Sequence, residues 1–305
     1  MTPLTVALPV YNAMPYLPEA VESILGQTLR DFQFLIVNDG STDDSADYLN
    51  SLRVPRVTVV HHDNRGLGNT LNRTLELCET PFYARMDADD ISLPERLERQ
   101  LRFLESNPTV VLCGGQIHFI AAGKRLPAPA APLGHEAIYA GLLRGRNALC
   151  HPSVMLRTRA ARAVEGYRIA GAGQDFDFFL RMGEHGRLAN HRRVLHGYRV
   201  HLDSSVTSRH RHIRCGIAFA IACANRRALR APEPDYDTFC TAWQRRGWLP
   251  RLGTRIDGWG VALYRGSLID RANGAPFRAW ARLVAAAACR PHRMTRHIRL
   301  PAARG

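Results

Sequence analysis

The sequence predicts an α/β fold built on a mostly parallel sheet. Short runs of β-branched residues alternate with helical patterns through the first half of the chain, as in βαβ units. Polar residues follow three of these runs directly, which is expected where parallel strands end at a ligand-binding crevice. The expected strands span residues 4–10, 32–38, 57–61 and 82–87, and the expected helices span residues 15–28, 43–52 and 68–78. Ser41 and Asp44 form the S-x-x-D pattern of a capping box before the second helix.

The second half of the chain continues this pattern less regularly. The Pro/Ala-rich residues 121–134 are expected to form a loop, either a crossover or a lid. After it come expected helices at 135–143 and 175–185, and expected strands at 153–156 and 194–200. From about residue 205 the sequence is helical and basic, with amphipathic helices at 213–229 and 277–289 and a frayed tail at 291–305. We therefore expect an α/β domain over 1–204, with halves 1–110 and 111–204, and a helical region over 205–305.

The positive charge of the chain is concentrated at one end. The 305 residues carry 41 Lys+Arg and 27 Asp+Glu, a net charge of +14. Residues 191–305 hold 22 Arg and six acidic residues, so this stretch carries +16 and the rest is close to neutral. Such asymmetry predicts an anionic partner, namely nucleic acid, a lipid surface or a phosphorylated substrate. The alternative is an arginine-rich surface that is simply solvated, because 40 of the 41 basic residues are Arg.

Composition also limits the class of protein. Hydrophobic residues make up 46% and charged residues 22% of the chain, so most of it is expected to be ordered. No apolar run approaches the roughly 18 residues of a membrane span. The first residues carry no basic flank and no cleavage site, so a secretory signal is not expected. Seven Cys without a CxxC pair are typical of reduced thiols, and a cytoplasmic protein is expected.

Asp39 follows the second expected strand. A single Asp after a strand usually caps the next helix, and Asp43 and Asp44 fit that interpretation. Asp39 fits it less well, because Gly40 and Ser41 already supply the turn and the cap. Asp39 is therefore a candidate binding residue.

Three carboxylates follow the fourth expected strand, at Asp87, Asp89 and Asp90. Carboxylates this close repel one another, and the cost falls most simply when a divalent cation binds. Strand alternation would let Asp87 and Asp89 lean the same way, with Ala88 leaving room between them. Because Mg²⁺ and Mn²⁺ prefer one or two carboxylates together with phosphate oxygens, we expect metal–diphosphate binding rather than a solvated turn.

These residues belong to a longer series of motifs in a fixed order. The series is Pro9-Val10-Tyr11-Asn12; Asn38-Asp39-Gly40-Ser41-Thr42-Asp43; Asp87-Ala88-Asp89-Asp90; Pro94-Glu95-Arg96 with Gln100; His151-Pro152-Ser153; Gly166-Tyr167; Gln174-Asp175-Phe176-Asp177 with Arg181; and Tyr198-Arg199-Val200-His201. Each motif alone is weak, but the ordered set over residues 4–203 resembles family 2 glycosyltransferases. The resemblance implies a GT-A fold, in which a nucleotide-sugar-binding half (1–110) is fused to an acceptor half (111–204). Residues beyond about 205 lie outside the match.

The resemblance implies donor-binding roles in the first half. Asp39 would read the donor base or ribose, with Pro9 and Tyr11 packing against the base. From the sequence alone, Arg65 follows the third strand, where its guanidinium could approach a phosphate or a base, and Asn72 could brace that loop. The donor is a nucleotide diphosphate sugar, and a UDP-sugar is favoured because Asp39 suits an imide N–H; thymine fits equally, and guanine stays open.

The resemblance also implies the catalytic roles. Asp87 would contact the ribose or the hydration shell of the metal, and Asp89 would bind the Mn²⁺ or Mg²⁺ that bridges the two phosphates. Asp175 would be the general base of an inverting transfer, and His201 would approach the phosphates or the metal. The family usually has Glu before the catalytic Asp, and Gln174 stands there in this chain, so acceptor recognition is expected to differ.

Elementary chemistry agrees with this assignment. Inversion at an anomeric carbon needs one carboxylate to take the acceptor proton and one cation to hold the leaving diphosphate. Asp175 also fits an acid at a helix N-terminus, which the helix dipole favours, and Asp177 is an alternative base only if the register differs. His151 either orients an acceptor hydroxyl or is a hydrogen-bonded structural residue.

Several other functions compete with this interpretation. A nucleic-acid-associated protein would use the basic region, but no helix-turn-helix, zinc-finger or RRM pattern is found. A nucleotidyltransferase would need a Gly-rich loop after strand one, and residues 9–15 contain no Gly. A haloacid-dehalogenase-like phosphatase would place its paired Asp after strand one.

The basic region suggests where the enzyme works. Its four Trp, at 243, 248, 259 and 280, either anchor an interface beside Arg or form a small helical core. We expect residues 205–305 to hold the enzyme at the anionic inner face of the cytoplasmic membrane, where it would glycosylate a glycan or lipid-linked acceptor of a bacterial surface polysaccharide.

Overall fold

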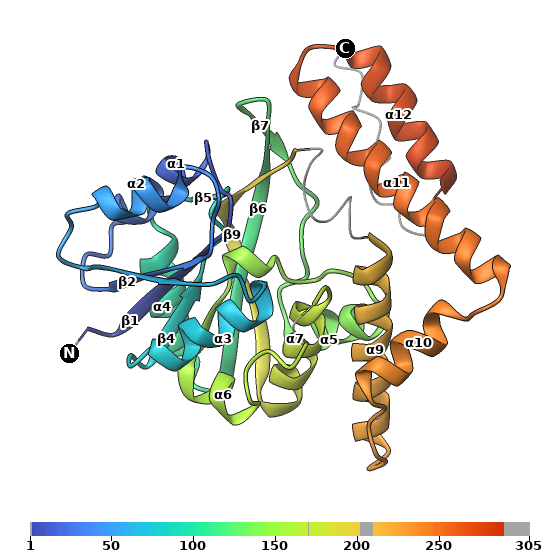
Figure 1. Cartoon of the computed structure of the whole chain (residues 1–305), viewed down its shortest axis with the longest axis horizontal. Helices are drawn as coiled ribbons and strands as arrows, with labels where there is room; N and C mark the ends of the chain where they lie inside the picture. Colours follow the sequence, from blue (N-terminus) through green and yellow to red (C-terminus); the bar gives the residue numbers. More distant parts are fainter. Residues whose placement is uncertain (1, 170, 202–209, 290–305) are drawn as a thin grey trace.

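A computed structural model describes residues 2–169, 171–201 and 210–289 (Figure 1). Its nine-stranded sheet has the order β3-β2-β1-β4-β8-β6-β9-β5, with β7 paired to β6. The first four strands are parallel to one another and come from the predicted βαβ units. They are β1 (Leu4–Val10), β2 (Gln33–Asp39), β3 (Val57–His62) and β4 (Phe82–Arg85). The predicted α/β class is therefore confirmed.

The second half adds strands that run in both directions. They are β5 (Ile91–Ser92), β6 (Val110–Ala121), β7 (Lys124–Pro127), β8 (Met155–Arg157) and β9 (Arg187–Arg199). β8 is antiparallel to both β4 and β6 and so joins the two halves into one sheet, whereas β9 is parallel to β6. β5 pairs antiparallel with β9, with Ile91 opposite Gly197, which brings residues from both halves together at this edge.

Helices cover both faces of the sheet. They are α1 (Leu17–Leu25), α2 (Ser45–Ser51), α3 (Leu67–Leu77), α4 (Arg96–Ser106), α5 (His135–Leu143), α6 (Thr158–Ala163) and α7 (Gln174–His185). The side chains of β1 alternate between the two faces. Leu4, Val6 and Leu8 share a core with α1, α2 and α4, whereas Ala7 shares the other core with α3, α5 and α7.

Within residues 210–289, four helices follow the sheet: α9 (His210–Ala228), α10 (Tyr236–Gln244), α11 (Trp248–Ala272) and α12 (Pro276–Cys289). α9 packs on α7, and Ile217, Ala220 and Ala224 are buried in the same core as α7. α11 and α12 pack side by side as a hairpin that projects from the body at the end where β6 turns into β7 (Figure 1). The predicted division at residue 204 stays a prediction, but α9 shares its buried side chains with the acceptor half.

Several local expectations need correction. The strand expected at 82–87 ends at Arg85, and residues 124–127 of the expected loop form β7, because they pair with residues 118–121 of β6. β6 and α4 were not expected from the sequence. The capping box is absent: Ser41 Oγ donates instead to Asn38, while Asp43 accepts from the backbone N–H of Ser45.

Among the described residues, we find no helix that combines the length and the apolar character needed to cross a membrane. α11 is 25 residues long, but it carries Arg and Asp along its length. The tail expected at 291–305 lies outside the described residues.

Candidate active site

An acidic turn follows β4 at the carboxyl edge of the parallel strands. Asp87, Asp89 and Asp90 each place one carboxylate oxygen so that all lie within 4.8 Å of one another. The residues lie in a turn and not in the strand, so chain reversal rather than strand alternation brings them together. The side chains of Asp87 and Asp89 are about one third exposed, whereas Asp90 is buried beneath them.

The electrostatics of this turn favour a cation. Burial raises the pKa of Asp90 well above its ordinary value, and the neighbouring Asp89 and Asp87 raise it further. Burial also raises the pKa of Asp87, against the opposing effect of an ion pair with Arg85. Carboxylates that resist ionisation this strongly would ionise readily beside a divalent cation. The donor set of three clustered carboxylates, two of them open to solvent, fits Mn²⁺ or Mg²⁺.

The end of β9 closes over the acidic turn. Nε2 of His201 lies 3.0 Å from Oδ2 of Asp89, so the structure brings together the two residues predicted to bind metal. The backbone N–H of Arg199 donates to Asp90 at 2.8 Å, and Nε of Arg199 donates to the backbone carbonyl of Asp89. His196 contacts Asp90 from below, with Nε2 2.8 Å from Oδ2. β9 therefore holds the turn through both main-chain and side-chain contacts.

Asp175 lies in the first turn of α7, near enough to Arg85 and Asp87 for their charges to affect the pKa of its carboxyl group. Burial raises the pKa of its carboxyl group, the N–H of Phe176 and the charge of Arg85 oppose the shift, and Asp87 adds to it. The side chain remains partly exposed. A carboxylate with a raised pKa that still reaches solvent suits a general base.

The polar neighbours of Asp175 on α7, Gln174 and Asp177, are buried. Gln174 is 8% exposed. Asp177 is fully buried, and both Arg181 and Arg168 donate to its carboxylate. Burial alone would raise the pKa of Asp177, but these two arginines outweigh it and lower the pKa. Asp177 is therefore committed to its two ion pairs. Asp175 is the acid in the first turn of α7 that stays partly exposed.

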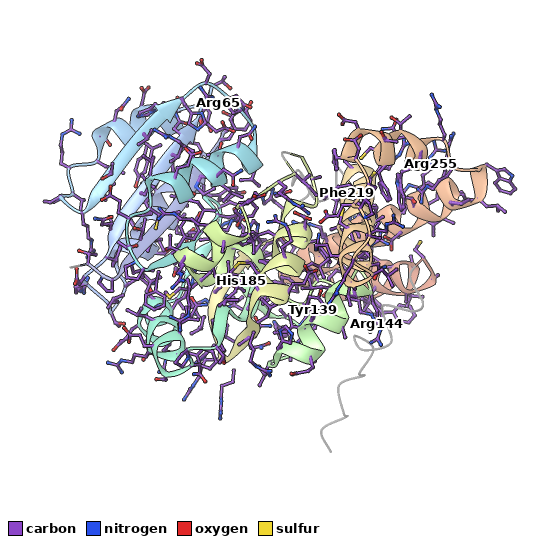
Figure 2. The ribbon with its side chains drawn as sticks, turned by 90° about the horizontal axis from the view of Figure 1, so that it is seen from below. Arg65, Tyr139, Arg144, His185, Phe219 and Arg255 are labelled. Atoms are coloured by element: carbon purple, nitrogen blue, oxygen red, sulfur yellow. The ribbon has the colours of Figure 1, made fainter. Side chains whose placement is uncertain are left out.

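The nucleotide half places its predicted residues around the ends of β1 and β2. Pro9 is buried within β1, and Tyr11, just beyond the strand, is 51% exposed. The carboxylate of Asp39 accepts the backbone N–H of Arg65 at 2.7 Å and that of Gly66 at 3.0 Å. Arg65 itself extends from this half, far from Arg255 on the C-terminal helices (Figure 2). Asp39 thus fixes the loop after β3, and its base-reading role stays a prediction.

Two predicted residues have structural partners. Nε2 of His151 lies 2.8 Å from the hydroxyl of Tyr167, and the ring packs edge-on against Phe179. Burial lowers the pKa of His151 well below its ordinary value, with Arg85 adding to the effect, so the ring is neutral. Asn72 exchanges hydrogen bonds with the backbone of Tyr167, and so it braces that segment and not the Arg65 loop as expected.

Sequence reasoning missed the groups that support the acidic turn. Arg85 is 2% exposed, pairs with Asp87, and affects the pKa values of both Asp87 and Asp175. Arg96 is fully buried and donates to Gln100, which in turn donates to the backbone carbonyls of Cys113 and Ser153. The signal for this pair in the sequence was the four-residue separation of Arg96 and Gln100, which places the two side chains on the same face of a helix. Arg85 carried no signal of its own.

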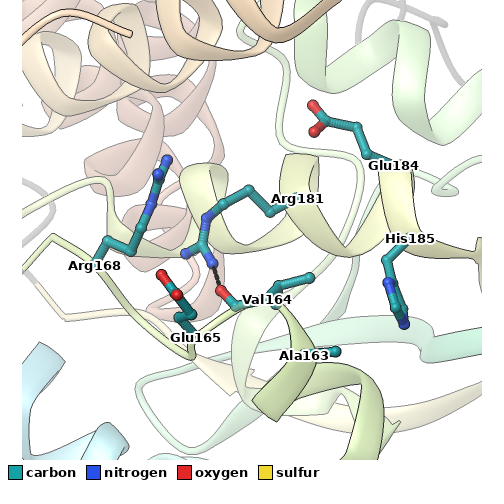
Figure 3. A pocket seen from close by; sticks show the side chains of 7 residues that line it. All are labelled: Ala163, Val164, Glu165, Arg168, Arg181, Glu184 and His185. Atoms are coloured by element: carbon teal, nitrogen blue, oxygen red, sulfur yellow. Dashed lines mark hydrogen bonds between the residues drawn. The ribbon is translucent and has the colours of Figure 1, made fainter. Parts of the chain in front are cut away.

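A surface hollow lies elsewhere, over α6 and α7. Its lining includes Arg168, Arg181, Glu184 and His185, and Arg181 points to the backbone carbonyl of Val164 (Figure 3). Arg168 and Arg181 are both paired with Asp177, so these two charges are already balanced. None of the residues that line the hollow is a predicted site residue, so the acidic turn stays the candidate active site.

Comparison with known proteins identifies relatives of this chain. The family model described as "Glycosyl transferase family 2" matches residues 5–164, just over half of the chain. The "Putative glycosyltransferase EpsE" of Bacillus subtilis (strain 168) is 31% identical over 256 residues, which cover 76% of this chain and 85% of EpsE. The "Amylovoran biosynthesis glycosyltransferase AmsE" of Erwinia amylovora is 35% identical over 171 residues, which cover 54% of this chain and 63% of AmsE.

Solved structures share the fold. Residues 1–349 of S. aureus TarS, in complex with UDP-GlcNAc, align with a TM-score of 0.64 at 16% identity, covering 94% of this chain and 91% of that one. The mannosyltransferase PcManGT from Pyrobaculum calidifontis, in complex with GDP-Man and Mn²⁺, aligns with a TM-score of 0.55 at 18% identity, covering 93% and 75%. At these identities the likeness concerns the fold.

Proposed function

This chain belongs to glycosyl transferase family 2 and has the GT-A fold, and on that premise we propose that it is an inverting, metal-assisted enzyme. It transfers a sugar from a nucleotide diphosphate sugar to a hydroxyl group of a glycan acceptor. The observation that supports the proposal is the cluster of three carboxylates in the acidic turn, together with Arg85 and Asp87 being near enough to Asp175 to influence the pKa of its carboxyl group.

Asp175 is the proposed base. As the acceptor oxygen bonds to the anomeric carbon, Asp175 takes the hydroxyl proton, and the bond from that carbon to the diphosphate oxygen breaks. The electron pair of the broken bond leaves with the nucleoside diphosphate. Because this leaving group is already acidic, no separate protein acid is needed. Attack opposite the leaving group inverts the anomeric configuration, through a transition state with oxocarbenium character.

Asp89 and His201 would hold the divalent cation, with Asp87 touching the ribose or the hydration shell of the ion. The clustered carboxylate oxygens of the turn and the 3.0 Å contact of His201 with Asp89 support this assignment. When bound, Mn²⁺ or Mg²⁺ neutralises negative charge on the leaving diphosphate. Arg199 and His196 keep the turn in shape, because both contact Asp90.

A UDP-sugar is the favoured donor. Tyr11, exposed at the end of β1, offers a ring for the base, and Pro9 supports it from within the strand. Asp39 lies at the neighbouring strand end, held against the backbone of Arg65. TarS binds UDP-GlcNAc on the same fold, whereas PcManGT binds GDP-Man, so the choice of base needs its own measurement.

The proposed acceptor is a glycan or lipid-linked glycan of a bacterial surface polysaccharide. AmsE, named for amylovoran biosynthesis, supports this setting. The +16 charge of residues 191–305 supports a place at the anionic inner face of the cytoplasmic membrane. Gln174, where the family usually has Glu, is the proposed source of a difference in acceptor recognition.

A donor screen tests the proposal. Thermal shift with UDP, TDP and GDP sugars and Mn²⁺ identifies the donor, because a ligand at 100 times its Kd adds about 2.7 kcal/mol of stability. Transfer to a synthetic acceptor is then followed by NMR, with EDTA as the metal-free control. We expect a product of inverted configuration and loss of transfer in EDTA. Retention of configuration, or full transfer in EDTA, would contradict the mechanism.

A further inference from the structure

α12 is an amphipathic helix whose large apolar side chains face outward. Phe277, Trp280 and Val284 follow one another at helical spacing and are 88%, 64% and 48% exposed; we call these three residues the α12 outer face. The buried positions of the same helix are the small Ala279 and Ala286. A helix of a globular protein normally buries its large apolar stripe, whereas nothing in the described part of the chain covers this one.

The charge around the α12 outer face is positive. Arg278 follows Phe277 in α12, Arg271 lies in the last turn of α11, and both side chains are exposed. Asp257 and Asp270 are the acids of residues 245–289, and each is already in an ion pair, Asp257 with His210 and Asp270 with Arg282. The surface of the hairpin therefore combines exposed aromatic side chains with arginines and offers no free acid.

The α12 outer face is held in a defined position relative to the acidic turn. Arg282 of α12 packs against Gly266 of α11, so closely that a Cβ at Gly266 would lie 2.3 Å from the guanidinium. The adjacent Arg265 is buried and donates to the backbone carbonyl of His201 at 3.3 Å. The hairpin is thus fixed to the end of β9, whose His201 contacts Asp89.

We propose that the α12 outer face docks on the anionic surface of a lipid bilayer. Phe277, Trp280 and Val284 enter the boundary between headgroups and acyl chains, and Arg271 and Arg278 contact anionic headgroups. Because Arg265 links the hairpin to His201, docking holds the acidic turn beside the membrane, where a lipid-linked substrate is within reach. This inference rests on the proposed function and assigns the membrane contact proposed there to the α12 outer face.

A second copy of the chain fits this face less well. Three side chains of this size bury roughly 500 Å², whereas each partner of a stable complex typically buries about 800 Å². A second copy would also offer Arg271 and Arg278 few acids to pair with, because the two acids of residues 245–289 are already in ion pairs. An anionic lipid surface satisfies both the apolar side chains and the charge.

Cosedimentation of the full chain with vesicles tests the proposal. We expect binding to phosphatidylcholine vesicles that contain phosphatidylglycerol, and about tenfold weaker binding to phosphatidylcholine alone. Combining Phe277→Ala, Trp280→Ala and Val284→Ala should weaken binding at least about tenfold. Combining Arg271→Glu and Arg278→Glu should abolish the preference for anionic vesicles. The matched control combines Leu133→Ala with Val194→Ala, two exposed apolar residues of the body, and should bind as the wild type does.

Three results would overturn the inference: equal binding to both vesicle types, unchanged binding of the triple variant, or a wild-type dimer that the triple variant converts to a monomer. Displacement from the vesicles by duplex DNA at physiological salt would also overturn it, because the face would then serve nucleic acid. Circular dichroism melting confirms that the variants are folded. Donor turnover is measured in the same preparations: wild-type protein that turns over donor but does not bind anionic vesicles contradicts this inference alone, whereas absent turnover by the wild type contradicts the proposed function.

Discussion

The sheet-containing body and the C-terminal helices differ in how many large apolar side chains they expose to solvent. Among the described residues up to 201, four such side chains are exposed: Tyr11, Leu67, Leu133 and Val194. The much shorter stretch 210–289 exposes eight, at 229, 248, 249, 252, 259, 277, 280 and 284. α9 is the exception among the C-terminal helices, because it is buried against α7. The body and α9 therefore bury nearly all of their large apolar side chains, whereas α11 and α12 expose many of theirs.

The first prediction concerns the body, where the proposed general base is the carboxylate of Asp175. Asp175→Asn keeps the shape of the side chain but removes its ability to accept a proton, so we expect transfer to fall about 10²- to 10⁴-fold in kcat. Because burial raises the pKa of Asp175, the wild-type rate should fall as pH drops through that raised value, where the carboxyl group becomes protonated. Initial rates of transfer measure both effects. Glu105→Gln, an exposed acid at the end of α4, is the control, and a rate for Asp175→Asn above about one tenth of wild type contradicts the assignment.

Two phenylalanines test the packing difference directly. Phe178 is fully buried in α7 and stacks on Tyr167 with ring centroids 4.4 Å apart, whereas Phe277 is 88% exposed. Phe178→Ala should lower the free energy of unfolding by about 3–5 kcal/mol, and Phe277→Ala should change it by less than about 0.5 kcal/mol. Urea unfolding measures both. Similar losses for the two variants would show that the hairpin surface is packed in solution.

Gly216 tests whether α9 belongs to the body. A Cβ at Gly216 would lie 2.0 Å from the backbone carbonyl oxygen of Ala172, next to Gly173, which has φ +91° at the start of α7. Gly216→Ala should therefore destabilise the protein by about 1–3 kcal/mol, although Ala normally favours a helix. Gly253→Ala in α11 meets open space and should stabilise by about 0.5–1 kcal/mol. Thermal unfolding of the two variants measures the change in stability. A gain in stability for both would show that α9 is not packed against the body.

An ion-pair network joins α7 to the end of α9, and it predicts a smaller, pH-dependent effect. Burial alone would raise the pKa of Glu233, but hydrogen bonds from Arg227 and Arg168 outweigh it and lower the pKa to about 2. In the unfolded chain this carboxyl group protonates near 4.5. Its stabilising effect is therefore present above about pH 4.5 and is lost as pH falls toward 2.

Glu233→Gln should remove on the order of 1 kcal/mol of stability at neutral pH and little at low pH. Melting temperatures across this pH range measure the effect. Glu76→Gln, whose partner Arg73 is on an exposed surface, should give a nearly flat difference. A flat difference for Glu233→Gln as well would mean that the network does not join the two helices.

Local pattern was sufficient for the first half of the fold. The alternation of β-branched runs with helical spacing predicted β1 to β3 and α1 to α3 to within a few residues. β1 and β2 were the clearest, because burial on both faces leaves a continuous apolar strand. The clustering of Asp87, Asp89 and Asp90 was equally local, since the three lie within four residues. The position of Asp175 at a helix start followed from the motif around it.

The same reasoning failed where contacts are distant in sequence. Nothing near residue 124 indicates that β7 pairs with β6, and a Pro/Ala-rich composition favours a loop. The capping box at Ser41 was replaced because the Ser41 hydroxyl donates to Asn38 and accepts the backbone N–H of Asn12. Arg85 has no motif, and only the fold shows it buried between Asp87 and Asp175.

The sequence by itself determined the class of fold, the family and the candidate site residues, because periodicity and motif order can be read along the chain. Only the tertiary structure decided that Asp177 is committed to Arg168 and Arg181, that α9 supports α7, and that α12 turns Phe277 and Trp280 outward. An amphipathic pattern shows that a helix has an apolar face, but it does not show whether that face meets a core or the solvent. That choice depends on which neighbour the helix packs against, and such contacts join residues far apart in the sequence.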